Sequence, residues 1–191
     1  MVVYQDIYNE LSNKLIGSET NDTSLITKTI KNYFSDKFSQ YYVAGTDSRP
    51  EYMLDITVMT CNPLEIFQNN KEEYKIILAV ESELGGNTAS SPKNVEKNVI
   101  EDYFKILSVI SDYKIIIGIY SIPSSDNNTD ILKSNIMKIQ NINKKSQNKN
   151  DFLVILLEGN HTIGNSRQVK LNFPLLIHGY IVKNDDTIIN L

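Results

Sequence analysis

Acidic side chains stand within or at the end of two segments that are otherwise suited to burial. Asp55 interrupts the apolar and β-branched segment 52–60, and Glu81 and Glu83 end the apolar run 76–80. A buried charge is costly, so it usually persists because it binds a cation or takes part in a reaction. Side chains at positions i and i+2 of a strand point to the same face, so we expect Glu81 and Glu83 to project together.

These three carboxylates could form a metal site if the two segments are neighbouring strands. Converging acids repel one another unless a divalent cation lies between them, and oxygen ligands favour Mg²⁺, Mn²⁺ or Ca²⁺. In a plainer interpretation, Glu81 and Glu83 are solvated at the end of a strand and Asp55 pairs with a lysine. A pair of glycosidase carboxylates, Asp55 and Glu81, is a further alternative, although the chain has no Trp for a sugar-binding cleft.

A basic side chain follows on the next predicted helix. The apolar spacing in 94–112 is typical of a helix, and Lys105 stands three residues after Asp102, on nearly the same side. Lys105 could orient a water molecule or stabilise a phosphate group. It could also form only an exposed salt bridge with Asp102 or Glu101.

The elements that must position these residues alternate between helices and buried strands. We expect an α/β fold with a mixed central β-sheet flanked by helices on both faces. One domain should span 1–191, with a core of roughly 24–157 and a β-rich C-terminal part over 158–191. The predicted helices are 7–16, 24–38, 94–112 and 131–142, the predicted strands are 41–45, 52–60, 74–84, 114–121 and 152–157, loops are expected over 85–93, 124–129 and 158–167, and one or two strands are expected within 168–182.

The composition excludes several classes of protein. The formal net charge of −4 excludes a surface that is basic throughout, and Arg49 and Arg167 are the only guanidinium groups available to contact bases or phosphates. A single cysteine, Cys61, allows no internal disulfide and no Cys-rich zinc site. No apolar run approaches the ~20 residues that a membrane-spanning helix needs, and the first residues lack the pattern of a signal peptide. We therefore expect a cytoplasmic protein without a membrane partner.

Taken together, these elements resemble the PD-(D/E)xK nuclease superfamily, in particular type II restriction endonucleases of the E-x-E subtype. The resemblance covers about residues 50–123, with the helix 24–38 in the position of that fold's first core helix. The motif is short, so it indicates a superfamily rather than a recognition sequence. The matching segments are 50–55, 81–87, 102–107 and 114–123.

The resemblance implies a restriction-endonuclease-like core and a metal-dependent endonuclease that hydrolyses phosphodiester bonds in DNA. Asp55 and Glu81 would bind Mg²⁺, which Mn²⁺ could replace, and the backbone carbonyl of Ser82 could also face the metal. Glu83 occupies a position where most of the superfamily has a lysine, so Glu83 or Lys105 could activate the water. A homodimer would be expected if the enzyme cuts both strands.

Other polar residues are weaker candidates for nucleic-acid contacts. Arg49, Lys133, Lys138, His161 and Arg167 could contact phosphates or bases, or they could belong to ordinary solvated surfaces. Acids upstream, Glu10 and Glu51, could add carboxylates to the site. The alternative function is a non-catalytic regulatory protein that binds DNA or another protein on a nuclease-like scaffold.

Overall fold

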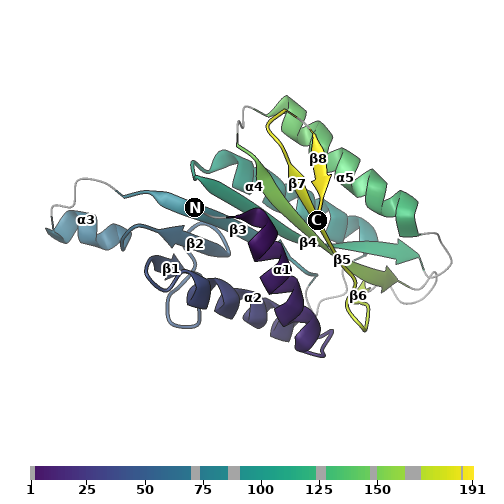
Figure 1. Ribbon diagram of the computed structural model, residues 1–191, viewed down its shortest axis with the longest axis horizontal. Helices are drawn as coiled ribbons and strands as arrows, with labels where there is room; N and C mark the ends of the chain where they lie inside the picture. Colours follow the sequence, from purple (N-terminus) through teal and green to yellow (C-terminus); the bar gives the residue numbers. More distant parts are fainter. Residues whose placement is uncertain are drawn as a thin grey trace.

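The computed structural model describes residues 3–69, 74–85, 91–123, 128–146, 150–161, 169–185 and 187–191 (Figure 1). It contains a mixed sheet of eight strands flanked by helices. The elements in chain order are α1 (Tyr4–Gly17), α2 (Thr23–Lys37), β1 (Tyr42–Ala44), β2 (Ile56–Met59), α3 (Pro63–Asn69), β3 (Ile76–Glu83), α4 (Pro92–Ser108), β4 (Tyr113–Pro123), α5 (Asn128–Lys145), β5 (Phe152–His161), β6 (Lys170–Leu171), β7 (Ile177–Val182) and β8 (Ile188–Asn190).

The strand order brings the ends of three parallel strands to one edge. The order is β1-β2-β3-β4-β5-β7-β8, and β6 pairs with β5. β3, β4 and β5 run parallel and are joined through α4 and α5, whereas the other pairings are antiparallel. We call the edge at which β3, β4 and β5 end the carboxyl edge. In sheets of this kind, ligands bind outside the carboxyl ends of the strands.

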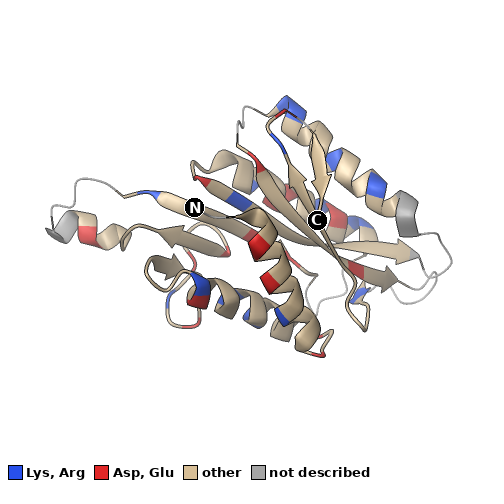
Figure 2. Ribbon diagram, viewed as in Figure 1, with Lys and Arg blue, Asp and Glu red and all other residues tan. Residues whose placement is uncertain are grey.

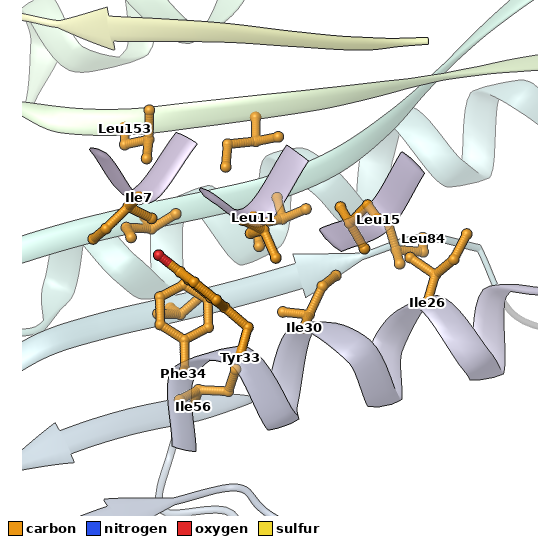
Figure 3. Close-up of a cluster of buried hydrophobic side chains, with 14 of the residues drawn as sticks. Ile7, Leu11, Leu15, Ile26, Ile30, Tyr33, Phe34, Ile56, Leu84 and Leu153 are labelled. Atoms are coloured by element: carbon orange, nitrogen blue, oxygen red, sulfur yellow. The ribbon is translucent and has the colours of Figure 1, made fainter. Parts of the chain in front are cut away.

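Two layers of helices bury the two faces of the sheet. In β3, Leu78 and Val80 belong to one hydrophobic cluster and Ala79 to the other, as the alternation of side chains in a strand requires. α1 and α2 contribute to the first cluster, shown in Figure 3, with Ile7, Leu11, Leu15, Ile26, Ile30 and Phe34. α4 and α5 contribute to the second with Val99, Tyr103, Ile106, Ile136 and Ile139.

Local signals set the start of two core helices. Asp22 precedes α2, and its side chain accepts hydrogen bonds from the backbone N–H groups of Ser24 and Leu25. Ser91 precedes α4 and accepts from Asn94 in the same way, and Pro92 follows in the first turn. These caps satisfy N–H groups that have no partner within the helix.

The predicted mixed α/β fold with a central mixed sheet flanked by helices is confirmed, but several element ends differ. α4 begins at Pro92, directly after its cap and two residues earlier than predicted, and ends at Ser108. β2 begins only at Ile56, so Asp55 lies before the strand and not in its middle. β5 continues to His161, because β4 pairs with it as far as Pro123 and β6 pairs on its other side. Residues 162–167 of the predicted loop 158–167 lie outside the described part.

In the part of the chain that the structure describes, no helix is both long enough and apolar enough to cross a membrane.

Candidate acidic site between β2, β3 and α4

Glu81 lies near the end of β3, on the face of the sheet that α4 covers. It follows Ala79 by two residues, so its side chain points into the same layer. Its exposed fraction is only 2%. A carboxyl group buried to this extent is costly unless it is protonated or has partners.

Asp55 is brought beside Glu81 by the pairing of β2 with β3. Ile56 pairs with Val80 in this antiparallel ladder, so the preceding Asp55 comes next to Glu81. Asp55 Oδ2 accepts two hydrogen bonds from Ser82, one from the backbone N at 2.8 Å and one from Oγ at 3.0 Å. One residue of β3 therefore holds the Asp55 carboxylate in place.

The backbone before β2 is shaped to deliver Asp55 to this position. Gly45, which follows β1, has a φ of 88°. A Cβ atom added to Gly45 would lie 1.7 Å from the carbonyl oxygen of Asp55. Only glycine permits this approach. Met53 also lies in the left-handed region, with a φ of 67°, which costs on the order of 1–3 kcal/mol for a residue with a side chain. The turn is thus strained directly before the candidate acid.

α4 adds a second acid and a lysine to the same place. Asp102 occupies the buried stripe of α4 between Val99 and Ile106, and it is 8% exposed. Its Oδ1 accepts a hydrogen bond of 2.5 Å from Lys105 Nζ, which also lies 3.7 Å from Glu81 Oε1. We call Asp55, Glu81, Asp102 and Lys105 the acidic site.

The acids of this site repel one another. Burial, with the charges of Asp55 and Asp102 added to it, raises the pKa of Glu81 to about 8, and the attraction of Lys105 opposes this rise. Burial also raises the pKa of Asp102, although its hydrogen bond with Lys105 opposes this. The hydrogen bond to Asp102 raises the pKa of Lys105, which is thereby held as a cation. One positive charge therefore faces three acidic groups.

Glu83 has a hydrogen-bond partner outside this arrangement. Its Oε1 accepts a hydrogen bond of 2.7 Å from the backbone N of Gly85. Among the described residues, no hydrogen bond or ion pair connects it with Asp55, Glu81 or Lys105. It nevertheless lies on the same face of β3 as Glu81, two residues nearer to the carboxyl edge.

The donor atoms of the acidic site fit a hard divalent cation better than a soft one. Asp55 and Glu81 offer carboxylate oxygens, and their mutual repulsion would be relieved by added positive charge. Over the described ranges, no group of three or more His, Cys, Asp or Glu side chains already has the arrangement of a metal-ligand set. Lys105 supplies the positive charge in the arrangement described here.

Of the two guanidinium candidates, the structure describes only Arg49, which contacts an aromatic ring and not the acidic site. Arg49 lies over the ring of Tyr42, with its guanidinium carbon 4.6 Å from the ring centre. Arg167 lies outside the described residues. A role in binding nucleic acid stays a prediction for both.

The other candidates for nucleic-acid contacts lie on α5 and at the end of β5. Lys133 is exposed, and Lys138 pairs with Glu96 of α4. Blue bands mark α5 along its length in Figure 2, whereas α1 carries red bands. His161 Nδ1 lies 2.6 Å from Ser121 Oγ at the carboxyl edge. None of these contacts involves the acidic site.

The upstream acids are engaged elsewhere. Glu10 Oε2 accepts hydrogen bonds from Lys37 at 2.6 Å and from Tyr33 at 3.0 Å. Glu51 pairs with Lys31 at 2.9 Å. These contacts connect α1, α2 and the turn before β2 and do not involve Glu81.

Two buried acids are not among the candidates that the sequence predicts. The sequence indicates an exposed salt bridge for Asp102, but Asp102 is buried three residues after Val99 on the apolar stripe of α4. The sequence predicts a loop at Glu158, but Glu158 lies in β5 and is 5% exposed. A local signal exists for each of them. Asp102 is a charge on the apolar stripe of a predicted helix, and Glu158 lies two residues after Leu156, on the same face of a predicted strand.

Comparison of the chain with protein-family models, curated proteins and solved structures gave no match.

Proposed function

We propose that this protein is a metal-dependent endonuclease that hydrolyses phosphodiester bonds in DNA, on a restriction-endonuclease-like core. The observation that carries the proposal is the position of buried Glu81, between Asp55 on one side and the Lys105 cation on the other. The chain order supports it as well: β2 and β3 pair antiparallel, α4 follows, and β4 returns parallel to β3. This is the order that the resemblance to PD-(D/E)xK nucleases requires.

In this proposal Asp55 and Glu81 hold Mg²⁺, with the Ser82 carbonyl as a further ligand. The bound ion would lower the pKa of a water molecule and stabilise charge on the phosphate oxygens. Ser82 holds Asp55 in position through its N–H and hydroxyl groups. Glu83, close to the carboxyl edge, is the candidate base that accepts the proton of the attacking water.

Lys105 has two functions in this proposal. Its ammonium group offsets part of the negative charge of Glu81 and Asp102 before the substrate binds. When the phosphate arrives, the same group can donate hydrogen bonds to the oxygens that gain charge. Asp102 is then a positioning residue, because it holds Lys105 by their hydrogen bond of 2.5 Å.

Cleavage assays on a panel of nucleic acids test this proposal. Supercoiled plasmid, a linear duplex, single-stranded DNA and RNA would be incubated with Mg²⁺, with Mn²⁺ or with EDTA. We expect duplex DNA to be cut only with a divalent ion, and Asp55→Ala and Glu81→Ala to abolish cutting. Glu51→Gln, an acid outside the site, is the control and should cut normally. If no substrate is cut under any condition, the proposal is wrong.

One observation favours a second candidate function. Lys105 already pairs with both Glu81 and Asp102, so the scaffold can neutralise much of its buried charge without a metal. This would suit a non-catalytic protein that binds DNA or another protein. Tight DNA binding without cleavage, unaffected by Asp55→Ala, would favour this candidate.

A further inference from the structure

A chain of hydrogen-bonded side chains lies at the carboxyl edge, on β4, β5 and the residue after β6. Glu158 Oε2 accepts a hydrogen bond from Tyr120 OH at 2.9 Å, and its Oε1 accepts one from Asn172 Nδ2 at 2.6 Å. Asn172 Oδ1 in turn accepts a hydrogen bond from Asn160 Nδ2. Glu158 is buried, whereas Asn160 is exposed. The chain therefore leads from the interior to the surface.

The carboxylate sets the direction of both amides. A carboxylate oxygen only accepts hydrogen bonds, so Asn172 must turn its NH₂ group toward Glu158 and its oxygen toward Asn160. That oxygen can only accept, so Asn160 must offer an N–H to it. Asn160 Oδ1, which has no partner among the described residues, and its second N–H are then left for an outside group. A buried acid thereby fixes which hydrogen-bonding pattern the surface presents.

A positive charge and an apolar surface lie beside this amide. Lys170 of β6 pairs in register with Asn160 of β5, so their side chains are neighbours. Lys170 is exposed and forms no ion pair with any residue that the structure describes. Asn160 and Lys170 line a pocket of about 460 Å³, together with Asn21 and Phe173. The ring of Phe173 provides the apolar surface and is 63% exposed.

The position suits a substrate of the acidic site. Glu83, Gly118 and Leu156 are aligned across β3, β4 and β5, and Asn160 lies four residues beyond Leu156. Asn160 is therefore two strand spacings across the sheet and four residues along β5 from Glu83, which corresponds to a distance of about 16 Å. This distance equals roughly five base-pair steps along a DNA duplex. One duplex could therefore contact both places.

We infer that Asn160 is a specificity-determining residue that contacts adenine in DNA, with Lys170 on the adjacent phosphate. An acceptor oxygen beside a donor N–H matches the N6 amino group and N7 of adenine in the major groove. Guanine presents two acceptors there and does not match. This inference rests on the proposed function for its substrate, but its test does not depend on cleavage.

The first test measures binding in EDTA by fluorescence anisotropy. The labelled probes are an alternating dA·dT duplex, the same duplex with carbon in place of adenine N7, and an alternating dG·dC duplex. We expect the wild type to bind the first about ten-fold more tightly than the other two. Asn160→Ala should remove this preference, and the exposed Asn13→Ala of α1 should keep it.

A second variant separates recognition from non-specific attraction. Lys170→Ala should weaken binding to all three probes equally and reduce the slope of log affinity against log salt by about one. Lys14→Ala, an exposed lysine of α1, is the matched control and should change neither quantity.

A third variant tests whether Glu158 acts through the amides. In Glu158→Gln the new amide can turn its NH₂ group toward Asn172, which reverses both asparagines and leaves Asn160 offering two donors. The preference should then shift toward dG·dC, and thermal unfolding would check the fold. A merely structural role for Glu158 would lower the affinity for all probes alike.

Equal affinity of the wild type for the three probes, or no measurable binding to any of them, would overturn the inference. Adenine preference without metal-dependent cleavage would instead refute only the proposed function. Cleavage without adenine preference would leave the function standing and refute the role of Asn160.

Discussion

Asp55 accepts two hydrogen bonds from Ser82, the residue that separates Glu81 from Glu83. This contact couples the start of β2 to the end of β3 at the point where the buried acids meet. The position of Asp55, one candidate metal ligand, therefore depends on Ser82, which is the neighbour of Glu81, the other candidate ligand. Ser82 lies in β3, and Asp55 directly precedes β2, which pairs with β3, so the contact continues the pairing of the two strands by one residue.

Replacing Ser82 with alanine should loosen Asp55 without removing it. Ser82→Ala deletes the hydroxyl donor and keeps the backbone donor, so we expect the free energy of unfolding to fall by about 0.5–1.5 kcal/mol. The Mg²⁺ concentration for half-maximal cleavage should rise. Urea denaturation and cleavage at a series of Mg²⁺ concentrations would measure these effects, and an unchanged Mg²⁺ dependence would argue against this coupling.

Gly45→Ala should displace Asp55, although the two residues lie ten positions apart in the sequence. The new Cβ would overlap the carbonyl of Asp55, in a backbone conformation that favours glycine. We expect unfolding to become easier by about 2 kcal/mol or more and cleavage to fall sharply. Gly17→Ala is the matched control, because nothing lies within 4 Å of its added Cβ. Equal behaviour of the two variants would contradict this role of Gly45.

Lys105 and Asp102 should behave as a coupled pair. Lys105→Met leaves both Glu81 and Asp102 without their cation, whereas Asp102→Asn removes one acid and one strong hydrogen bond. A double-mutant cycle on the free energy of unfolding should give a coupling of about 1 kcal/mol. Asp102→Asn should lower kcat more than it changes KM, because it alters the placement of Lys105 and the charge beside Glu81 but removes no group that contacts the substrate. Strictly additive effects would show that the pair does not act together.

Glu81 should make the metal-free protein less stable as the pH rises. Its pKa is about 8 in the folded chain against an ordinary value of 4.5, so between these values the unfolded chain has lost a proton that the folded chain keeps. The free energy of unfolding should then fall with increasing pH, by at most about 1.4 kcal/mol per pH unit. Denaturation in EDTA from about pH 5 to about pH 8 would show this.

The variant Glu81→Gln provides the comparison for that experiment. It lacks the titrating group, so its stability should depend less on pH than that of the wild type over the same range. Mg²⁺ should restore part of the lost stability of the wild type near pH 8, because an ion that binds only the folded state stabilises it. Parallel pH profiles of the two proteins would rule out Glu81 as the source.

Much of the fold could be predicted because its main elements carry local patterns. The apolar run before Glu81 and the β-branched run after Lys114 indicated buried strands, and the spacing of Val99, Tyr103 and Ile106 indicated the helix between them. Strand alternation also predicted the shared face of Glu81 and Glu83. These features depend on neighbours within a few residues.

The features that could not be predicted depend on distant parts of the chain. β5 extends to Glu158 and beyond because β4 and β6 pair with it, and neither pairing is visible in its own sequence. The place of Asp102 on the apolar stripe of α4 is a local signal of its burial, but its position beside Glu81 follows only from the packing of α4 against β3. β2 starts only at Ile56, after a turn in which Met53 has a positive φ that a methionine rarely adopts.

The central claim is tested most directly by the initial rate of cleavage of a labelled DNA duplex as the Mg²⁺ concentration is raised. For the wild type we predict no cleavage in EDTA and a rate that rises with Mg²⁺ to saturation. For Asp55→Asn and Glu81→Gln, which keep the size of the side chains, the rate should fall about a hundred-fold or more. Cleavage that persists in EDTA, or that both variants retain at the wild-type rate, would contradict the assignment of the acidic site as a metal-dependent nuclease centre.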